Sequence, residues 1–283
     1  MYKTKDKKFF LGVLGHPIGH SLSPKLHAFL GKEFGIDLDY QKIDIAPCDL
    51  EKEIDALKLN GVKGLNITIP HKIEIIKYLD EISEKAKILN SVNTVVNRNG
   101  KLYGYSTDGD GFYYSLLLNG CEIKNKNVLV IGAGGAARAV CLSLAQNGVK
   151  SITNISRTQD KVHTICDMLE KYTDASVFDA LSENMNYDFI INTTPVGMHP
   201  LENENSCKFM EFINENTTCV DLIYNPKKTL FLREAEKKNA KIINGLGMLL
   251  MQGILSFQKF FDIEIDKDKA YDKLQEEFKD FRI

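Results

Sequence analysis

The sequence predicts an α/β protein of two domains, each built around its own sheet. Strand-like and helix-like segments alternate along the 283 residues, which is typical of α/β proteins with parallel sheets. The character of the chain changes near residues 112–125, where a polar turn leads into a buried-strand pattern at residues 128–133. We therefore expect residues 1–111 to form one domain and residues 112–246 a second, with helices in 247–283 returning to the first domain.

The first domain is predicted to alternate strands with helices and to end in a hairpin. Ser23 precedes Pro24, and this pair favours a helix that begins at Pro24 with Ser23 as its N-cap. The dipeptide Asn99–Gly100 favours a tight turn between two strands. The predicted strands cover residues 9–14, 38–43, 64–69, 92–97 and 101–105, and the predicted helices cover residues 24–34, 49–58 and 70–89.

The second domain is predicted to be a parallel sheet with helices between its strands. Asp108 precedes the first of these helices and is expected to cap its N-terminus. A polar, acidic stretch at residues 201–216 indicates a surface excursion. The predicted strands cover residues 128–133, 150–155, 187–192, 218–221 and 241–243, and the predicted helices cover residues 109–118, 136–146 and 159–171. The two terminal helices, predicted over residues 247–261 and 267–281, return to the first domain.

The composition excludes several classes of protein. A net charge of -2 and a pI near 6.3 give no electrostatic case for nucleic acid or an anionic membrane as a partner. No apolar run approaches the length that a membrane span needs, and the apolar stretch near the start is too short for a signal-peptide core. We therefore predict a cytoplasmic protein. The six cysteines include no Cys-x-x-Cys pair, so no metal site is predicted.

The segment VLVIGAGGAAR, residues 128–138, predicts a dinucleotide-binding turn. It reads as a strand, then G-x-G-x-x-[GA], then a helix whose N-terminus attracts phosphates. Gly132 permits the tight turn, Gly134 lets the backbone approach a pyrophosphate, and Ala137 permits close packing of the helix on the strand. The residues predicted to contact the cofactor here are Gly132, Ala133, Gly134, Gly135 and Ala136.

The end of the next predicted strand favours NADP over NAD. NAD sites place an acidic residue there to bind the ribose 2′-hydroxyl, whereas NADP sites need a cation. Here Arg157 can form paired hydrogen bonds with a 2′-phosphate, and Ser156 and Thr158 can donate their hydroxyls to it. Lys161 adds a second cation one helical turn further, although the acidic Asp160 lies beside it. We predict NADP as the cofactor.

Polar side chains also gather at strand ends and loops of the first domain. Ser21 and Ser23 are two residues apart and point the same way in an extended loop. Asn66 and Thr68 share one face of a predicted strand. Lys72 follows at a predicted helix N-terminus, where a cation is electrostatically disfavoured. A residue placed against that preference is a candidate for function.

These segments together resemble the shikimate dehydrogenase family over almost the whole chain. The matching motifs are, in order, GHPIGHSLSP, NITIPHK, SVNT, STDGDG, GAGGAARA, SRT, NTTPVGM, DLIYNP and GLGMLLMQG. The resemblance implies an N-terminal α/β substrate domain, a Rossmann-type NADP-binding domain and a cleft between them. The motifs depart from the family at Ser106 and Ser156, where asparagine is usual.

The resemblance also implies a reaction and the residues that carry it. The family reduces 3-dehydroshikimate to shikimate reversibly with NADPH, on the way to chorismate and the aromatic amino acids. Lys72 and Asp108 correspond to its catalytic pair. The positions that correspond to ligands of shikimate are Ser21, Ser23, Asn66, Thr68, Asn93, Tyr224 and Gln252. Thr193 and Gly245 correspond to further residues beside the cofactor.

Three alternatives stay open on the sequence. A quinate/shikimate dehydrogenase that uses NAD is the nearest, and an acidic residue in place of Arg157 would favour it. A non-catalytic module that binds NADP or a cyclic acid is the second, and the loss of Lys72 or Asp108 would favour it. A tetrahydrofolate-linked or tRNA-linked NADP reductase shares the Rossmann half alone. The predicted partner is a small-molecule substrate, shikimate or 3-dehydroshikimate, and the protein is expected to be a monomer or a homodimer.

Overall fold

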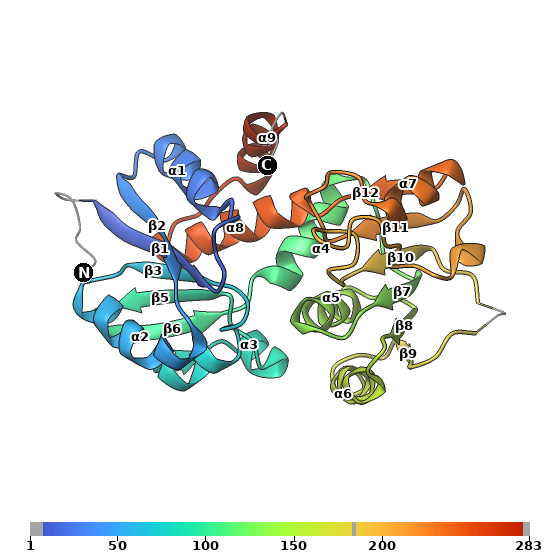
Figure 1. Cartoon of the computed structure of the whole chain (residues 1–283), viewed down its shortest axis with the longest axis horizontal. Helices are drawn as coiled ribbons and strands as arrows, with labels where there is room; N and C mark the ends of the chain where they lie inside the picture. The colour runs from blue at the N-terminus through green and yellow to red at the C-terminus, as the bar shows by residue number, and fades with distance from the viewer. Residues whose placement is uncertain (1–7, 183–184, 280–283) are drawn as a thin grey trace. The chain divides into compact units, whose positions relative to one another are not determined.

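The computed structural model describes residues 8–182 and 185–279. The basic start of the chain and the predicted helix end at residue 281 lie outside the described residues. The chain divides into two compact units, which Figure 1 shows with their elements labelled. Unit 1 contains Met1–Thr107 and Leu250–Ile283, and unit 2 contains Asp108–Leu249. Each unit has its own sheet.

The sheet of unit 1 has the strand order β2-β1-β3-β5-β6-β4. Its central strands are parallel, because β1 (Phe9–Gly15) pairs in the same direction with β2 (Leu38–Asp44) and with β3 (Gly64–Ile67). The predicted hairpin is confirmed: β5 (Thr94–Arg98) and β6 (Lys101–Tyr105) are antiparallel. Asn99 and Gly100 take φ values of 54° and 86° in the turn, which suits asparagine and glycine. The hairpin and the short β4 (Glu81–Ile82) make the sheet mixed.

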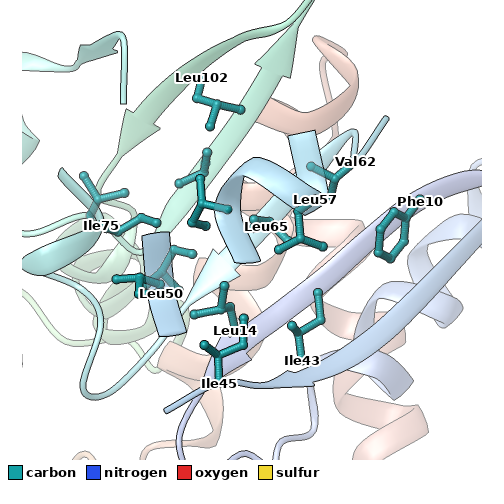
Figure 2. Close-up of a cluster of buried hydrophobic side chains, with 14 of the residues drawn as sticks. Phe10, Leu14, Ile43, Ile45, Leu50, Leu57, Val62, Leu65, Ile75 and Leu102 are labelled. Carbon is teal, nitrogen blue, oxygen red and sulfur yellow. The ribbon is translucent and has the colours of Figure 1, made fainter. Parts of the chain in front are cut away.

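Helices cover both faces of this sheet. The helices of unit 1 are α1 (Ser23–Glu33), η1 (Pro47–Asp49), α2 (Leu50–Leu59), η2 (Glu74–Tyr78), α3 (Glu84–Leu89), α8 (Leu246–Phe261) from Leu250 onward, and α9 (Lys267–Phe278). Phe10 and Leu14 of β1 point into a buried cluster with Leu57 of α2, which Figure 2 shows. The alternating residue Leu11 packs against Phe260 of α8. Burial on both faces explains why β1 is an apolar run.

The segment between residues 68 and 89 differs from the prediction. The strand predicted over residues 64–69 ends at Ile67, and the helix predicted over residues 70–89 is replaced by a turn, η2, β4 and α3. The backbone N–H groups of Asp80 and Ser83 donate to Leu102 and Gly104 of β6, at 2.9 and 2.8 Å. The Ser83 hydroxyl then accepts the N–H of Ala86 and starts α3. Pairing with a later strand therefore interrupts the helical pattern.

The start of α1 also differs from the prediction. The helix begins at Ser23 itself, so Ser23 is not its N-cap, and the preceding Leu22 makes no side-chain cap. The hydroxyl of Ser21 instead accepts the N–H of Ser23 at 3.3 Å. The position of Ser21 in this turn gives it a local structural role that the sequence did not reveal. Asp108 is likewise the first residue of α4 (Asp108–Leu118) and does not precede it.

Unit 2 contains a fully parallel sheet in the order β12-β11-β10-β7-β8-β9. Numbered within the unit, this is the order 3-2-1-4-5-6 read from β9, the doubly wound order of dinucleotide-binding sheets. The predicted Rossmann-type fold is confirmed. The strands are β7 (Asn127–Ile131), β8 (Ser151–Ile155), β9 (Ser176–Phe178), β10 (Phe189–Asn192), β11 (Thr218–Asp221) and β12 (Lys241–Ile243).

The helices of unit 2 are α4, α5 (Gly135–Gln146), α6 (Gln159–Leu169), η3 (Met210–Phe212) and α7 (Leu230–Lys237). The sequence predicted neither β9 nor α7, because each is short. Gly109 brings α4 close to α5: a Cβ at Gly109 would lie 2.7 Å from the carbonyl oxygen of Ala139. The hydroxyl of Ser143 donates to the carbonyl of Gly109 at 2.7 Å. Among the described residues, no helix is long and apolar enough to span a membrane.

Candidate active site

A glycine-rich turn leaves the sheet of unit 2 at the point where the winding direction reverses, between β7 and β10. Gly132 has φ +114°, a conformation that residues with a Cβ rarely adopt, and a Cβ there would lie 2.4 Å from the hydroxyl oxygen of Thr193. Nothing lies within 4 Å of the positions that a Cβ would take at Gly134 and Gly135. The backbone at the start of α5 is therefore open to an anion. This cradle fits the pyrophosphate of a dinucleotide.

Two neighbouring strands hold the turn. Asn154 of β8 is fully buried, and its amide donates to the carbonyls of Val130 and Gly132 at 3.1 and 2.7 Å. On the other side, the N–H and the hydroxyl of Thr193 donate to the carbonyl of Ile131 at 2.9 and 2.8 Å. Thr193 was predicted as a residue beside the cofactor, whereas Asn154 was missed. The sequence did contain a signal for Asn154, since a polar residue within an apolar strand needs a hydrogen-bond partner when it is buried.

The predicted 2′-phosphate group lies at the end of β8, which is next to β7 in the sheet. Arg157 is exposed in the connection to α6, and Ser156 is half-buried. The N–H of Thr158 donates to the hydroxyl of Ser156 at 3.5 Å, so the loop folds back on itself. Thr158 precedes α6, and Lys161 is exposed in its first turn. Arg157 and Lys161 can therefore meet an anion from solvent.

A buried carboxylate organises the loops after β10 and β11. Asp221 is 0% exposed and accepts hydrogen bonds from the amide of Asn192 at 2.9 Å and the hydroxyl of Thr229 at 2.6 Å. It also accepts the backbone N–H of Ile223 at 3.1 Å. Burial raises the pKa of Asp221 from 3.8 to about 6, although these hydrogen bonds oppose the shift. Asp221 was missed in the sequence, where it reads as the end of a strand.

The same loops carry two predicted site residues. Tyr224 is half-buried in the connection after β11, and burial raises the pKa of its phenol. The N–H of Gly245 donates to the carbonyl of Ile223 at 3.0 Å. A Cβ at Gly245 would lie 1.9 Å from the carbonyl oxygen of Leu222, so glycine is required there. The loops after β10, β11 and β12 are thus fixed to one another within unit 2.

In unit 1, strand register brings polar side chains together. Asn66 of β3 stands opposite Thr94 of β5 in the antiparallel pair. The neighbours Leu65 and Val95 belong to the apolar cluster on the α2 side, so Asn66 and Thr94 face α8. There the amide of Asn66 donates to the hydroxyl of Ser256 at 3.0 Å, and its carbonyl accepts from the hydroxyl of Tyr40 at 2.7 Å. Asn66 is 6% exposed.

A second asparagine joins the same polar network. Asn93 is 3% exposed, and its amide donates to the hydroxyl of Thr107 at 2.9 Å. Its carbonyl accepts the N–H of Thr107 at 2.9 Å and the hydroxyl of Thr94 at 3.0 Å. The backbone carbonyl of Gln252 accepts from the hydroxyl of Ser256 at 2.8 Å. Three predicted substrate residues, Asn66, Asn93 and Gln252, therefore belong to one hydrogen-bonded network.

The remaining predicted residues of unit 1 lie at the ends of its strands. Thr68 and Lys72 are half-buried in the turn that follows β3, and the carbonyl of Lys72 accepts the N–H of Val92 at 2.9 Å. The sequence argument for Lys72 assumed a cation at the N-terminus of an α-helix. Lys72 instead precedes the short helix η2 and begins no α-helix, so that argument is wrong. Ser23 is 8% exposed and Ser21 half-buried. Asp108, in unit 2, directly follows Thr107 and is 9% exposed.

The cysteines and other metal-binding side chains form no cluster of three within the described ranges 8–182 and 185–279. Cys121, Cys141, Cys207 and Cys219 are buried, Cys166 is half-buried and Cys48 is exposed. Burial raises the pKa of the Cys207 thiol to about 11 and that of Cys219 to about 12. These buried thiols are protonated at neutral pH and behave as small apolar side chains.

A parallel sheet wound in this order, with its glycine turn at the reversal, defines the chain as an α/β enzyme that works with a dinucleotide. Residues 13–95 match the family described as the shikimate dehydrogenase substrate binding domain. Residues 117–229 match the family described as shikimate / quinate 5-dehydrogenase. The chain belongs to the shikimate dehydrogenase family, and the resemblance inferred from the motifs is confirmed.

Relatives agree over nearly the full chain. A protein of Methanococcus aeolicus named shikimate dehydrogenase (NADP(+)) is 44% identical over 270 residues, which cover 94% of this chain and 96% of the relative. A crystal structure of shikimate dehydrogenase in complex with NADP+ is 38% identical, with a TM-score of 0.86 and 96% of each chain covered. A shikimate 5-dehydrogenase of Listeria monocytogenes in complex with shikimate and NAD is 31% identical, with a TM-score of 0.86 and coverage of 97% and 99%.

Proposed function

We propose that this chain is an NADP-dependent shikimate dehydrogenase that reduces 3-dehydroshikimate to shikimate reversibly. Unit 1 would bind the substrate, and unit 2 would bind the cofactor. The observation that carries the choice of substrate is the network of uncharged hydrogen-bonding side chains around Asn66 and Asn93. Shikimate is a small carboxylate with several hydroxyls, and asparagine, serine and threonine supply both donors and acceptors to such a ligand.

The cofactor is placed by residues of unit 2. The N–H groups at Gly134 and Gly135 would receive the pyrophosphate, and Arg157 with Ser156 and Thr158 would receive the 2′-phosphate. The loops fixed by Asp221 would border the nicotinamide through Thr193 and Gly245. When bound, the nicotinamide supplies or accepts the hydride, and the protein supplies position and the proton.

Lys72 and Asp108 are the proposed catalytic pair. When the C3 ketone is reduced, negative charge develops on its oxygen, and the ammonium of Lys72 would stabilise that charge and deliver the proton. Asp108 would hold Lys72 and share a hydrogen bond with the same hydroxyl. Thr107 supports this arrangement, because its N–H and hydroxyl are bonded to Asn93 and fix the residue directly before Asp108.

The test of the function is an absorbance assay at 340 nm with purified protein. We expect NADPH to form with shikimate and NADP, and to form much more slowly with quinate or with NAD. Faster turnover of quinate with NAD would favour the quinate/shikimate alternative. Binding of NADP or shikimate by calorimetry without any turnover would identify a non-catalytic binding module.

Replacing Arg157 by alanine should raise the KM for NADPH and leave the KM for NADH nearly unchanged. A charge-assisted hydrogen bond contributes about 1.5–3 kcal/mol, so we expect a roughly ten- to hundredfold increase in KM for NADPH. Arg233→Ala is the matched control, since Arg233 is an exposed arginine on α7 of the same unit. An equal loss with both cofactors would show that Arg157 does not recognise the 2′-phosphate.

Two further properties remain proposals for this chain. We expect a cytoplasmic location, and the six free cysteines support it, since unpaired cysteines are typical of a reducing compartment. A monomer or a homodimer is expected, and light scattering of the purified protein separates the two.

A further inference from the structure

One buried hydroxyl joins the polar side chains of unit 1. Ser256 lies on α8, is 0% exposed, and its oxygen contacts four groups. The partners are the amide nitrogen of Asn66 at 3.0 Å, the hydroxyls of Thr94 and Thr107 at 2.8 and 3.3 Å, and the carbonyl of Gln252 at 2.8 Å. We propose that Ser256 is a positioning residue that sets the amide orientations of the substrate-binding asparagines, and so determines affinity for the substrate. This inference rests on the proposed function.

The hydrogen-bond inventory of Ser256 fixes Asn66. A hydroxyl has one proton and two lone pairs, and the Ser256 proton goes either to the carbonyl of Gln252 or to the hydroxyl of Thr94, whose own proton goes to Asn93. The oxygen can then only accept, so Asn66 must turn its NH₂ group toward Ser256. The other end of the amide supports this orientation, because the Asn66 carbonyl accepts a hydrogen bond from the hydroxyl of Tyr40. A rotation of the amide by 180° would turn its carbonyl toward the Ser256 oxygen and break that hydrogen bond.

The same hydroxyl reaches Asn93 through two threonines. Thr94 contacts Ser256 and also donates to the carbonyl of Asn93 at 3.0 Å. Thr107 contacts Ser256 and accepts from the amide nitrogen of Asn93 at 2.9 Å. Thr94 thus contacts the carbonyl end of the Asn93 amide, and Thr107 contacts both ends, because its N–H also donates to that carbonyl. The two asparagines, from β3 and from the segment before β5, are aligned through one atom of α8.

Replacing Ser256 by alanine would remove the hydroxyl that connects the polar side chains of this network. Ser256 and Thr94 are both 0% exposed and Thr107 is 3% exposed, so these hydroxyls are shielded from bulk solvent. The N–H group of Asn66 and the two threonine hydroxyls would each lose a buried hydrogen-bond partner. The amides would then take new rotamers, while the apolar packing of α8 would remain, because its neighbours Ile254 and Phe257 are unchanged.

The test is the kinetics of Ser256→Ala with shikimate and NADP. We expect the KM for shikimate to rise about tenfold, which corresponds to about 1.4 kcal/mol. The KM for NADP should stay within about twofold, because unit 2 is untouched. Ser115→Ala is the matched control: Ser115 is a buried helical serine whose hydroxyl donates to the carbonyl of Phe112 at 2.7 Å. It should leave both KM values unchanged.

A double-mutant cycle separates positioning from simple stability. Because Ser256 acts through Asn66 as well as Asn93, the effects of Ser256→Ala and Asn66→Ala on the KM for shikimate should be less than additive. Additive effects, or an unchanged KM in Ser256→Ala, would overturn the inference while leaving an active wild-type enzyme. A wild-type protein with no shikimate activity would instead overturn the proposed function, and the inference with it.

Discussion

Replacing Lys72 by alanine should lower kcat for shikimate oxidation by about 10²-fold or more, the range expected when a group that moves a proton is lost. The variant should still fold and still bind NADPH, because Lys72 lies in a turn of unit 1 and the cofactor turn lies in unit 2. Lys72 is fixed through its backbone carbonyl, which accepts the N–H of Val92, and this bond survives the substitution. Steady-state kinetics with calorimetry of NADPH binding would measure both properties.

The control for Lys72→Ala is Lys77→Ala. Lys77 lies on η2, the short helix that follows the turn containing Lys72. Its side chain is exposed and pairs with Glu74. Its removal takes away the same charge from nearly the same segment, so it reports any general electrostatic effect on the substrate carboxylate. We expect kcat for Lys77→Ala to remain within about twofold of the wild-type value, since exposed ion pairs contribute little. Near wild-type turnover in Lys72→Ala would remove Lys72 from the mechanism.

Local signals predicted the cofactor unit well. Around Gly132, a strand, a residue with positive φ and a helix N-terminus follow one another within a few residues. Each of these features has a recognisable sequence pattern. The hairpin at Asn99–Gly100 was predictable for the same reason. No short segment of the sequence specifies the order of the strands in the sheet. However, alternating strands and helices joined by right-handed connections can form only a few sheet topologies.

The predictions failed where a distant partner decides the local structure. Residues 70–89 have a helical pattern, but the N–H groups of Asp80 and Ser83 pair with β6, and the helix is lost. Ser256 looks like an ordinary helical serine, and its importance appears only when it meets Asn66, 190 positions away. The helical electrostatics used for Lys72 assumed a helix that does not form there. The choice of Lys72 therefore rests on the motif resemblance and not on the local argument.

Asp221 raises a different expectation, because it is a buried carboxylate with no proposed role in the chemistry. Its pKa is raised from 3.8 to about 6 by burial, so between these two pH values the folded protein binds a proton that the unfolded chain has released. The contribution of this group to stability is therefore fully present below pH 3.8 and is lost as the pH rises through about 6. A difference of about two pKa units corresponds to about 3 kcal/mol.

Asp221→Asn removes this titration while keeping the shape of the side chain. We expect the free energy of unfolding of the wild-type protein, minus that of the variant, to be about 2.5 kcal/mol larger at pH 4 than at pH 7, because the unfolded carboxyl is already partly ionised at pH 4. Urea unfolding of both proteins at a series of pH values gives this difference, and the other titrating groups cancel in it. The largest change should fall between pH 4 and pH 6, because the unfolded carboxyl titrates at the lower limit and the buried one at the upper. Parallel stability curves across that range would mean that the charge of Asp221 is compensated by Asn192, Thr229 and the N–H of Ile223, so that burial costs the fold nothing.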